Sequence, residues 1–169
     1  MPILESEKIE FEQKSRREFA FLEQSKGLSY KGCSASEDDP RDAYVVAKYR
    51  QGEFRVDIVW DPFEMILAVR LRLTDETLGR REKFVHLEPF VEYVTEGAIL
   101  PIVPQVYVGL SSRKLDAIME GRAQLFKEGI DGPLHEVAAK LQHYIDEIRS
   151  APSDVVRGYH SWFERHGKN

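Results

Sequence analysis

Residues 43–73 constrain the fold of this chain more than any other segment, because apolar and polar residues alternate there in three successive runs. The runs cover residues 43–50, 53–60 and 65–73, and they are separated by Gln51-Gly52 and Asp61-Pro62. Glycine and proline at those two places are typical of tight turns between strands. The segment therefore predicts a three-stranded antiparallel meander.

The alternation also predicts which side chains face the core. Tyr49, Val56 and Leu67 share one apolar face with their neighbours at every second position. A two-residue Gln51-Gly52 loop pairs Tyr49 with Phe54, and a four-residue loop over residues 61–64 suits Pro62 in the second position of a turn. Loops of two or four residues leave the same side chains facing inward, so the predicted inner face does not depend on that choice.

The outer face of the predicted sheet is divided into two halves. Near the first turn it carries charged side chains, namely Lys48, Arg50, Glu53, Arg55, Arg70 and Arg72. At the other end it carries the apolar side chains Tyr44, Val46, Val59, Ile66 and Ala68. Either a helix or loop of the chain covers the apolar half, or it is an uncovered patch with a charged border, which would suit a protein partner.

The remaining segments predict helices around this sheet. Apolar spacing predicts a helix over residues 5–26, followed by a short extended piece at 28–30 and a polar, acidic loop over 34–42. A fourth strand over 83–87 and a short helix opened by Glu88-Pro89 come next, then an extended segment broken by Pro101 and Pro104. Three helices follow, over residues 111–128 and 131–150 and from Ser153 onward.

This order predicts an α+β fold in which an antiparallel meander sheet of about four strands carries an N-terminal helix and a helical C-terminal third. The 169 residues are most simply a single domain, in which an α+β body over residues 1–110 packs with a helical subdomain over 111–169. A chain of this size buries enough surface to fold without a disulfide or metal.

Charge and composition exclude several functions. The net charge of −5 argues against general nucleic-acid binding, which requires clustered Lys and Arg, and it is compatible with a basic protein partner. No run of 18 apolar residues is present, and the first residues lack the pattern of a secretory signal. Cys33 is the single cysteine, which suits a reducing compartment. We therefore expect a cytoplasmic protein without a membrane span.

The sequence contains no catalytic motif. The spacing of the five histidines does not fit a metal site on one helix, no phosphate-binding or dinucleotide-binding loop is present, and Cys33 precedes an acidic loop that would raise its pKa. We therefore expect no catalytic, cofactor-binding or metal-binding residues, and the sequence favours a protein that is not an enzyme. An anion pocket built on Arg55, Arg70 and Arg72 is the alternative to a solvated charged face.

A helix carrying Glu18-Phe-Ala-Phe-Leu22 and ending at Gly27, an acidic loop, the strand Arg55-Val-Asp-Ile-Val-Trp-Asp61 and the Phe90–Val94 helix follow one another in the chain. This order resembles a group of small, largely uncharacterised bacterial α+β proteins, some of which resemble immunity proteins of toxin–antitoxin-type competition systems. The resemblance spans residues 18–97, excludes the helical third, and carries over no functional residue.

The leading hypothesis is a non-enzymatic protein-binding module of the bacterial cytoplasm, and its specific form is an immunity-type inhibitor of a toxin. The acidic loop would steer a basic partner and the outer sheet face would contact it. The candidate partner-binding residues are Glu37, Asp38, Asp39, Asp42, Tyr44, Val46, Val59 and Ile66.

Two other hypotheses remain. A small-molecule-binding protein or enzyme would have a pocket between the sheet and the C-terminal helices, lined by Trp60, Tyr107 and Trp162, with Arg70 or Arg72 holding an anionic group. A homodimer, rather than a monomer, would use the stripe of Val155, Tyr159, Trp162 and Phe163, unless that stripe covers the chain's own core.

Overall fold

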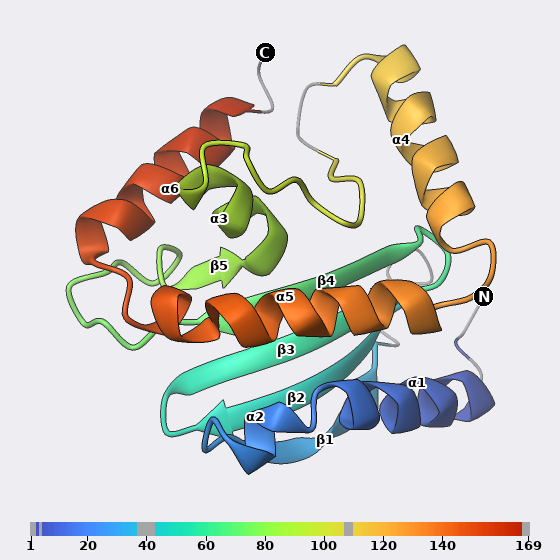
Figure 1. The fold of residues 1–169 in the computed structure, drawn as a ribbon, viewed down its shortest axis with the longest axis horizontal. Helices are drawn as coiled ribbons and strands as arrows, with labels where there is room; N and C mark the ends of the chain where they lie inside the picture. The colour runs from blue at the N-terminus through green and yellow to red at the C-terminus, as the bar shows by residue number, and fades with distance from the viewer. Residues whose placement is uncertain (1–2, 4, 37–42, 107–109, 167–169) are drawn as a thin grey trace.

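The structure, a computed structural model, describes residues 3, 5–36, 43–106 and 110–166. Its elements are α1 (Glu5–Glu18), α2 (Phe21–Gln24), β1 (Ser29–Ala35), β2 (Val45–Gln51), β3 (Phe54–Asp61), β4 (Ile66–Arg72), β5 (Phe84–His86), α3 (Leu87–Val94), α4 (Ser112–Leu125), α5 (Asp131–Arg149) and α6 (Ser153–His166). The chain is an α+β protein with an N-terminal helix, an antiparallel sheet and C-terminal helices, as the sequence predicted (Figure 1).

The sheet has five strands in the order β1-β2-β3-β4-β5, where the sequence predicted about four. The additional strand is β1, which pairs with β2 from Ser29↔Arg50 to Ala35↔Val45. Part of it was predicted as an acidic loop, because Ser34 and its neighbours lack the apolar alternation of a strand. A bulge between Tyr30 and Gly32, where Gly32 has φ +112°, lets this segment follow β2 despite its composition.

The first hairpin turns one residue later than predicted. Gln51 pairs with Phe54, so the loop consists of Gly52 and Glu53, and Tyr49 pairs with Val56 instead of Phe54. Gly52 has φ +57° and occupies the first loop position, where two-residue hairpins favour glycine. The register therefore differs by two residues from the prediction, and the inner face is unchanged because two residues are one full repeat of a strand.

The second hairpin has the predicted length of four residues but covers residues 62–65, since Asp61 still pairs with Ile66. The carboxylate of Asp61 holds the turn by accepting hydrogen bonds from the backbone N–H groups of Phe63 and Glu64, each at 2.9 Å. Met65 then adopts φ +52° before the chain enters β4. An aspartate that caps its own turn displaced the loop by one residue.

The predicted N-terminal helix is two helices. The chain leaves α1 after Glu18 and re-enters a short helix at Phe21. This break allows Phe19, Phe21 and Leu22 all to be buried. In one straight helix these three positions would point in different directions around the axis, so they could not all face the core. Farther along, the Ser111 hydroxyl caps α4 by accepting the Lys114 N–H, as predicted.

The core lies between the inner face of the sheet and the helices that cover it. Figure 1 shows α1 and α5 on the same side of the sheet. From α5, Leu134, Leu141 and Ile145 are buried, and from the sheet, so are the residues at every second position, including Val56 and Leu67. Burial of each such side chain contributes roughly 1.5–3 kcal/mol, so this layer is the main source of stability.

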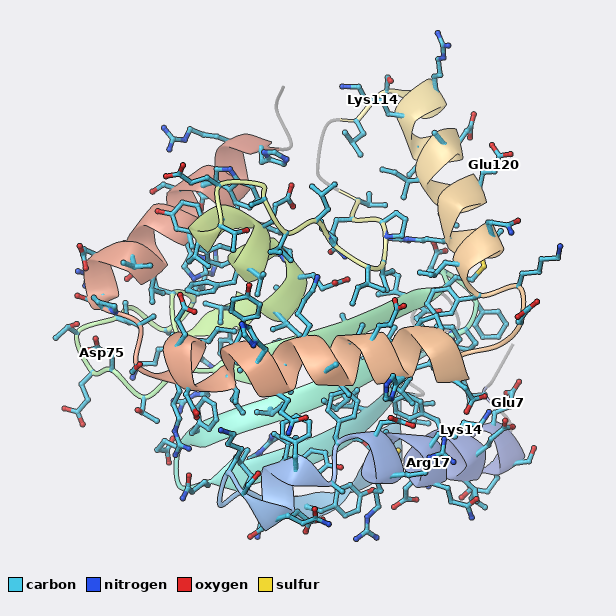
Figure 2. The ribbon with its side chains drawn as sticks, in the orientation of Figure 1. Glu7, Lys14, Arg17, Asp75, Lys114 and Glu120 are labelled. Atoms are coloured by element: carbon cyan, nitrogen blue, oxygen red, sulfur yellow. The ribbon has the colours of Figure 1, made fainter. Side chains whose placement is uncertain are left out.

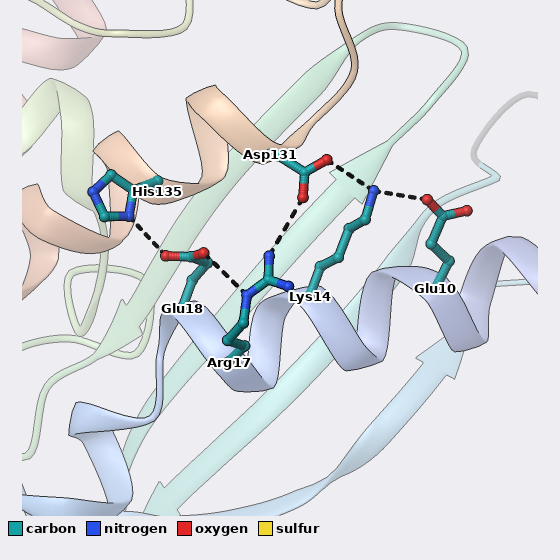
Figure 3. A network of polar contacts seen from close by, with 6 residues as sticks. All are labelled: Glu10, Lys14, Arg17, Glu18, Asp131 and His135. Carbon is teal, nitrogen blue, oxygen red and sulfur yellow. Dashed lines mark hydrogen bonds and ion pairs between the residues drawn. The ribbon is translucent and has the colours of Figure 1, made fainter.

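A chain of charged contacts joins α1 to α5 at the edge of this layer (Figure 3). Lys14 lies 2.7 Å from Glu10 and 3.0 Å from Asp131, and Arg17 lies 3.4 Å from Asp131. The imidazole of His135 is 2.8 Å from Glu18. Because these side chains are largely exposed, the network orients the two helices more than it stabilises them.

Helix α4 stands at one end of the molecule, where Lys114 and Glu120 project from it (Figure 2). Arg122 attaches its last turns, because its buried guanidinium donates to the backbone oxygens of Pro104 at 2.9 Å and Glu64 at 3.2 Å. The ring of Phe126 lies 4.9 Å from that of Trp60. The predicted apolar stripe of this helix is thus packed only near its C-terminus, and Leu115 remains 39% exposed.

Candidate functional site

A hollow of about 600 Å³ lies on the outer face of the sheet. Its lining residues come from all five strands and from the ends of the β1–β2 connection, and they are Ser34, Ala35, Ser36, Tyr44, Val46, Lys48, Asp57, Val59, Ile66, Ala68, Arg70 and His86. None of these described residues belongs to a helix. The hollow is therefore a property of the sheet itself, on the face opposite to the core.

One half of the hollow is apolar. Val46, Val59 and Ala68 lie directly side by side on β2, β3 and β4, as the pairings Val46↔Val59 and Val59↔Ala68 show. Val46 is buried, whereas Tyr44, Val59, Ile66 and Ala68 are half-buried. The structure therefore gathers Tyr44, Val46, Val59 and Ile66, four of the predicted partner-binding residues, on one surface.

The other half is charged and is organised by Asp57. This aspartate lies in register between Lys48 on β2 and Arg70 on β4, and its side chain is only 8% exposed. Oδ1 accepts a hydrogen bond from Arg50 at 2.7 Å, and Oδ2 accepts one from Arg70 at 3.2 Å. A carboxylate at this depth requires such partners, because burial of an uncompensated charge is costly.

His86 forms the edge of the charged half. It pairs with Arg70 across the β4–β5 ladder, and the ring of Phe163 lies parallel to its imidazole with the centroids 6.5 Å apart. The residue as a whole is exposed. Desolvation by the protein around its ring, and then the charges of Arg70 and His160, lowers the pKa of His86 to about 4. The imidazole is therefore neutral near pH 7.

The acidic positions Glu37, Asp38, Asp39 and Asp42 lie outside the described residues. The steering of a basic partner by this segment therefore stays a prediction. The described chain enters the segment at Ser36 and leaves it at Ala43, and both Ser36 and Tyr44 line the hollow.

The three arginines of the predicted anion pocket have different partners. Arg72 donates to the carboxylate of Glu53 at 2.9 Å and to its backbone oxygen at 3.0 Å, whereas Arg70 is engaged with Asp57. Arg55 is exposed and pairs in register with Arg50 and Arg72. Among them only Arg70 lines the hollow, where Lys48 is the second cation.

The residues proposed for a small-molecule pocket lie in separate places. Trp60 contacts Phe126 and lines a hollow of about 260 Å³ between α1, the sheet and the α4–α5 connection. Trp162 packs on Tyr93 at 5.8 Å, and Tyr107 lies outside the described residues. A further hollow of about 480 Å³ lies among α3, α5 and α6, where Tyr93, Glu96 and Glu147 line it.

The apolar stripe of α6 packs within the chain. Tyr159 and Val156 are buried, and the Tyr159 ring lies 5.2 Å from that of Phe90 in α3. Trp162 and Phe163 are half-buried against the same cluster. The structure thus explains this stripe by the chain's own core, and it leaves the choice between monomer and homodimer untested.

The remaining reactive groups are the possible metal ligands and the thiol of Cys33. In the described part of the chain, no three His, Cys, Asp or Glu side chains are grouped so that they could hold a metal ion, and no helix is long and apolar enough to span a membrane. Burial and then the nearby Glu12 raise the pKa of Cys33 to about 11. The shift has the expected direction, and the acidic residues that were expected from the sequence to cause it lie outside the described residues.

Sequence reasoning missed the two groups that shape the charged half of the hollow. Neither residue was named from the sequence. Asp57 is buried between Arg50 and Arg70, and His86 borders the hollow from β5. The available signal was the alternation itself, because Asp57 and His86 both fall at outward positions of their strands.

Comparison of the chain with models of protein families, with curated proteins and with solved structures found no match.

Proposed function

We propose that this chain is a protein-binding module and that the outer face of its sheet is the binding surface. The observation that carries the proposal is the hollow of about 600 Å³, in which an apolar floor adjoins a charged border. Interfaces between proteins commonly have this composition, with apolar contacts at the centre and polar groups around them.

The size of the sheet sets a limit on this interface. Strands of about seven residues at the usual rise and spacing give a face of roughly 400–500 Å² for a five-stranded sheet. A standard interface buries about 800 Å² on each partner. The partner therefore either binds transiently or also contacts the surroundings of the sheet, and the β1–β2 connection is the nearest neighbouring segment.

The specific form of the proposal is an immunity-type inhibitor that covers the active site of a toxin. The resemblance of residues 18–97 to small bacterial proteins of that kind supports it. The acidic segment would steer a basic partner towards the hollow, since complementary charges raise association rates more than affinity. This form predicts that salt slows the association.

The alternative is a small-molecule-binding protein or enzyme. The hollow at Trp60 supports it, but its volume of about 260 Å³ is below the usual range of roughly 300–1,000 Å³ for ligand sites. The hollow of about 480 Å³ among α3, α5 and α6 falls within that range, but neither Trp60 nor Arg70 lines it. The inner face of the sheet, where that pocket was expected, is occupied by the buried stripe of α5. We therefore prefer the protein-binding function.

Affinity isolation from the host organism tests the proposal with three baits. The first is the natural chain. The second is Ala68→Gln, which places a larger polar side chain in the hollow without removing any core contact. The third is Ala123→Gln, the same substitution at an exposed position of α4.

We expect a protein recovered in stoichiometric amount by the natural chain and by Ala123→Gln but not by Ala68→Gln. Recovery of no stoichiometric partner, or equal recovery of one partner by all three baits, would contradict the proposal.

A further inference from the structure

The centre of the charged half of the hollow has more positive than negative charge. Lys48, Arg50 and Arg70 are grouped around Asp57, the one carboxylate among the described residues that line the hollow. The net formal charge of these four side chains is positive, although the whole chain has a net charge of −5. The net charge of these four side chains is thus opposite in sign to that of the whole chain.

This cluster also has more hydrogen-bond donors available at the surface than acceptors. Each oxygen of Asp57 already accepts a bond from one arginine. The side chain of Arg70 is 46% exposed, and a guanidinium has five N–H donors, of which Asp57 takes one. Donors are therefore available at the surface of the hollow, whereas Asp57 is buried and each of its oxygens already has an arginine partner.

The positions of Lys48 and Arg70 suit a single acceptor between them. They lie on strands that flank β3, so their backbones are separated by two strand spacings, about 10 Å in total. Long side chains from both strands can reach one group located above Asp57. Beside it, Val59 and Ala68 offer half-buried apolar surface.

We infer that the partner presents an acidic side chain flanked by aliphatic residues, whose carboxylate binds between Lys48 and Arg70 while its neighbours contact Val59 and Ala68. This inference rests on the proposed function and specifies the chemistry of the partner at the same surface. A basic side chain there would meet two cations, and Asp57, the carboxylate among the described lining residues, is already bonded to Arg50 and Arg70.

A peptide titration tests this inference. Three capped peptides, acetyl-Ala-Leu-Xaa-Leu-Ala-amide with Glu, Gln or Lys at Xaa, are added to the ¹⁵N-labelled chain while its amide resonances are followed. We expect saturable shifts at Lys48, Ala68 and Arg70 with the Glu peptide. Binding of the Gln peptide should be about fivefold weaker, because one half-exposed charged pair contributes up to ~1 kcal/mol.

Charge reversal provides the matched control. Lys48→Glu should weaken binding of the Glu peptide by about fivefold or more, and the variant should bind the Lys peptide in preference to the Glu peptide. Lys31→Glu makes the same change at an exposed position of β1 that does not line the hollow, and it should leave the order of the peptides unchanged.

Equal binding of the Glu and Gln peptides, a preference for Lys, or no shift up to the solubility limit would overturn the inference. So would stronger binding of a single-stranded oligonucleotide at the same amides.

The two proposals fail separately. If Ala68→Gln abolishes capture of a partner while the peptides show no preference for Glu, the protein-binding function stands and the acidic side chain inferred for the partner is wrong. If the Glu peptide binds as expected and isolation recovers no partner, the function is wrong and the chemistry of the hollow stands.

Discussion

Lys140 Nζ lies 2.8 Å from Glu88 Oε1, and both side chains are almost fully buried. The two oxygens of Glu88 also accept the backbone N–H groups of Ile102 and Val103, at 2.7 and 2.9 Å. Lys140 donates in addition to the backbone oxygen of Leu100. This pair therefore connects α3, α5 and the irregular segment after α3.

Lys140→Met should lower the free energy of unfolding by about 3 kcal/mol, because it leaves the carboxylate of Glu88 buried without its cation. Urea denaturation measures the change. The double variant Glu88→Gln/Lys140→Met removes both charges but leaves Ile102 or Val103 without an acceptor for its backbone N–H, so it should recover only part of the lost free energy. A loss below ~1 kcal/mol in the single variant would show that the pair contributes little.

Gly158→Ala should destabilise the chain although alanine favours helices. A Cβ at this position of α6 would overlap the hydroxyl of Tyr93, and overpacking of this kind costs about 1–3 kcal/mol. The same substitution in a Tyr93→Phe background should cost less, and thermal unfolding of the four proteins of this cycle measures the difference.

Gly132→Ala is the control for that cycle, because no atom lies within 4 Å of the added Cβ. It should be neutral or stabilise the chain by up to ~1 kcal/mol. An equal cost of Gly158→Ala with and without the Tyr93 hydroxyl would show that the overlap does not cause the loss.

Tyr49→Phe should leave stability unchanged or raise it by ~1 kcal/mol. The Tyr49 hydroxyl is buried and has no hydrogen-bond partner among the described residues, so its removal eliminates a desolvation cost without the loss of a bond. Urea denaturation compares the stability of Tyr49→Phe with that of Tyr159→Phe, which removes the hydroxyl that accepts the backbone N–H of His86. The prediction fails if Tyr49→Phe is the more destabilising of the two.

His86 should titrate with a midpoint near pH 4 in the folded chain, against about 6.5 for an ordinary histidine. The unfolded chain then binds a proton as the pH falls through about 6.5, while the folded chain does so only near 4. The stabilising contribution of the neutral imidazole is therefore complete above pH 6.5 and decreases progressively as the pH falls towards 4.

NMR titration of the His86 ring measures this midpoint. His86→Asn should reduce the pH dependence of stability between pH 6.5 and 4, measured by urea denaturation. A midpoint near 6.5 in the folded chain would show that the imidazole is as well hydrated as in water.

The pattern of residues was sufficient to predict the faces of the sheet and most helices. Val56 and Leu67 face the core, and Val46 and Val59 face outward, because a strand alternates its side chains whatever its exact register. The helices α4 and α6 begin where the sequence predicted, because capping by Ser111 and the missing N–H of Pro152 act within one turn of the chain.

Several features depended on contacts between distant residues. The strand β1 exists because β2 offers it hydrogen-bond partners, and the break between α1 and α2 occurs because Phe19 and Phe21 both reach the core. No local pattern predicts these two features, because each is decided by competition between alternative tertiary contacts.

The sequence by itself determined that an outer sheet face with an apolar and a charged half exists, because local alternation is set by the geometry of the strand. Only the tertiary structure decided that this face is hollow, that Asp57 is buried between Arg50 and Arg70, and that His86 borders the hollow. The physical reason is that burial and hydrogen-bond partners are defined by the neighbouring strands, which the chain brings together only when it folds.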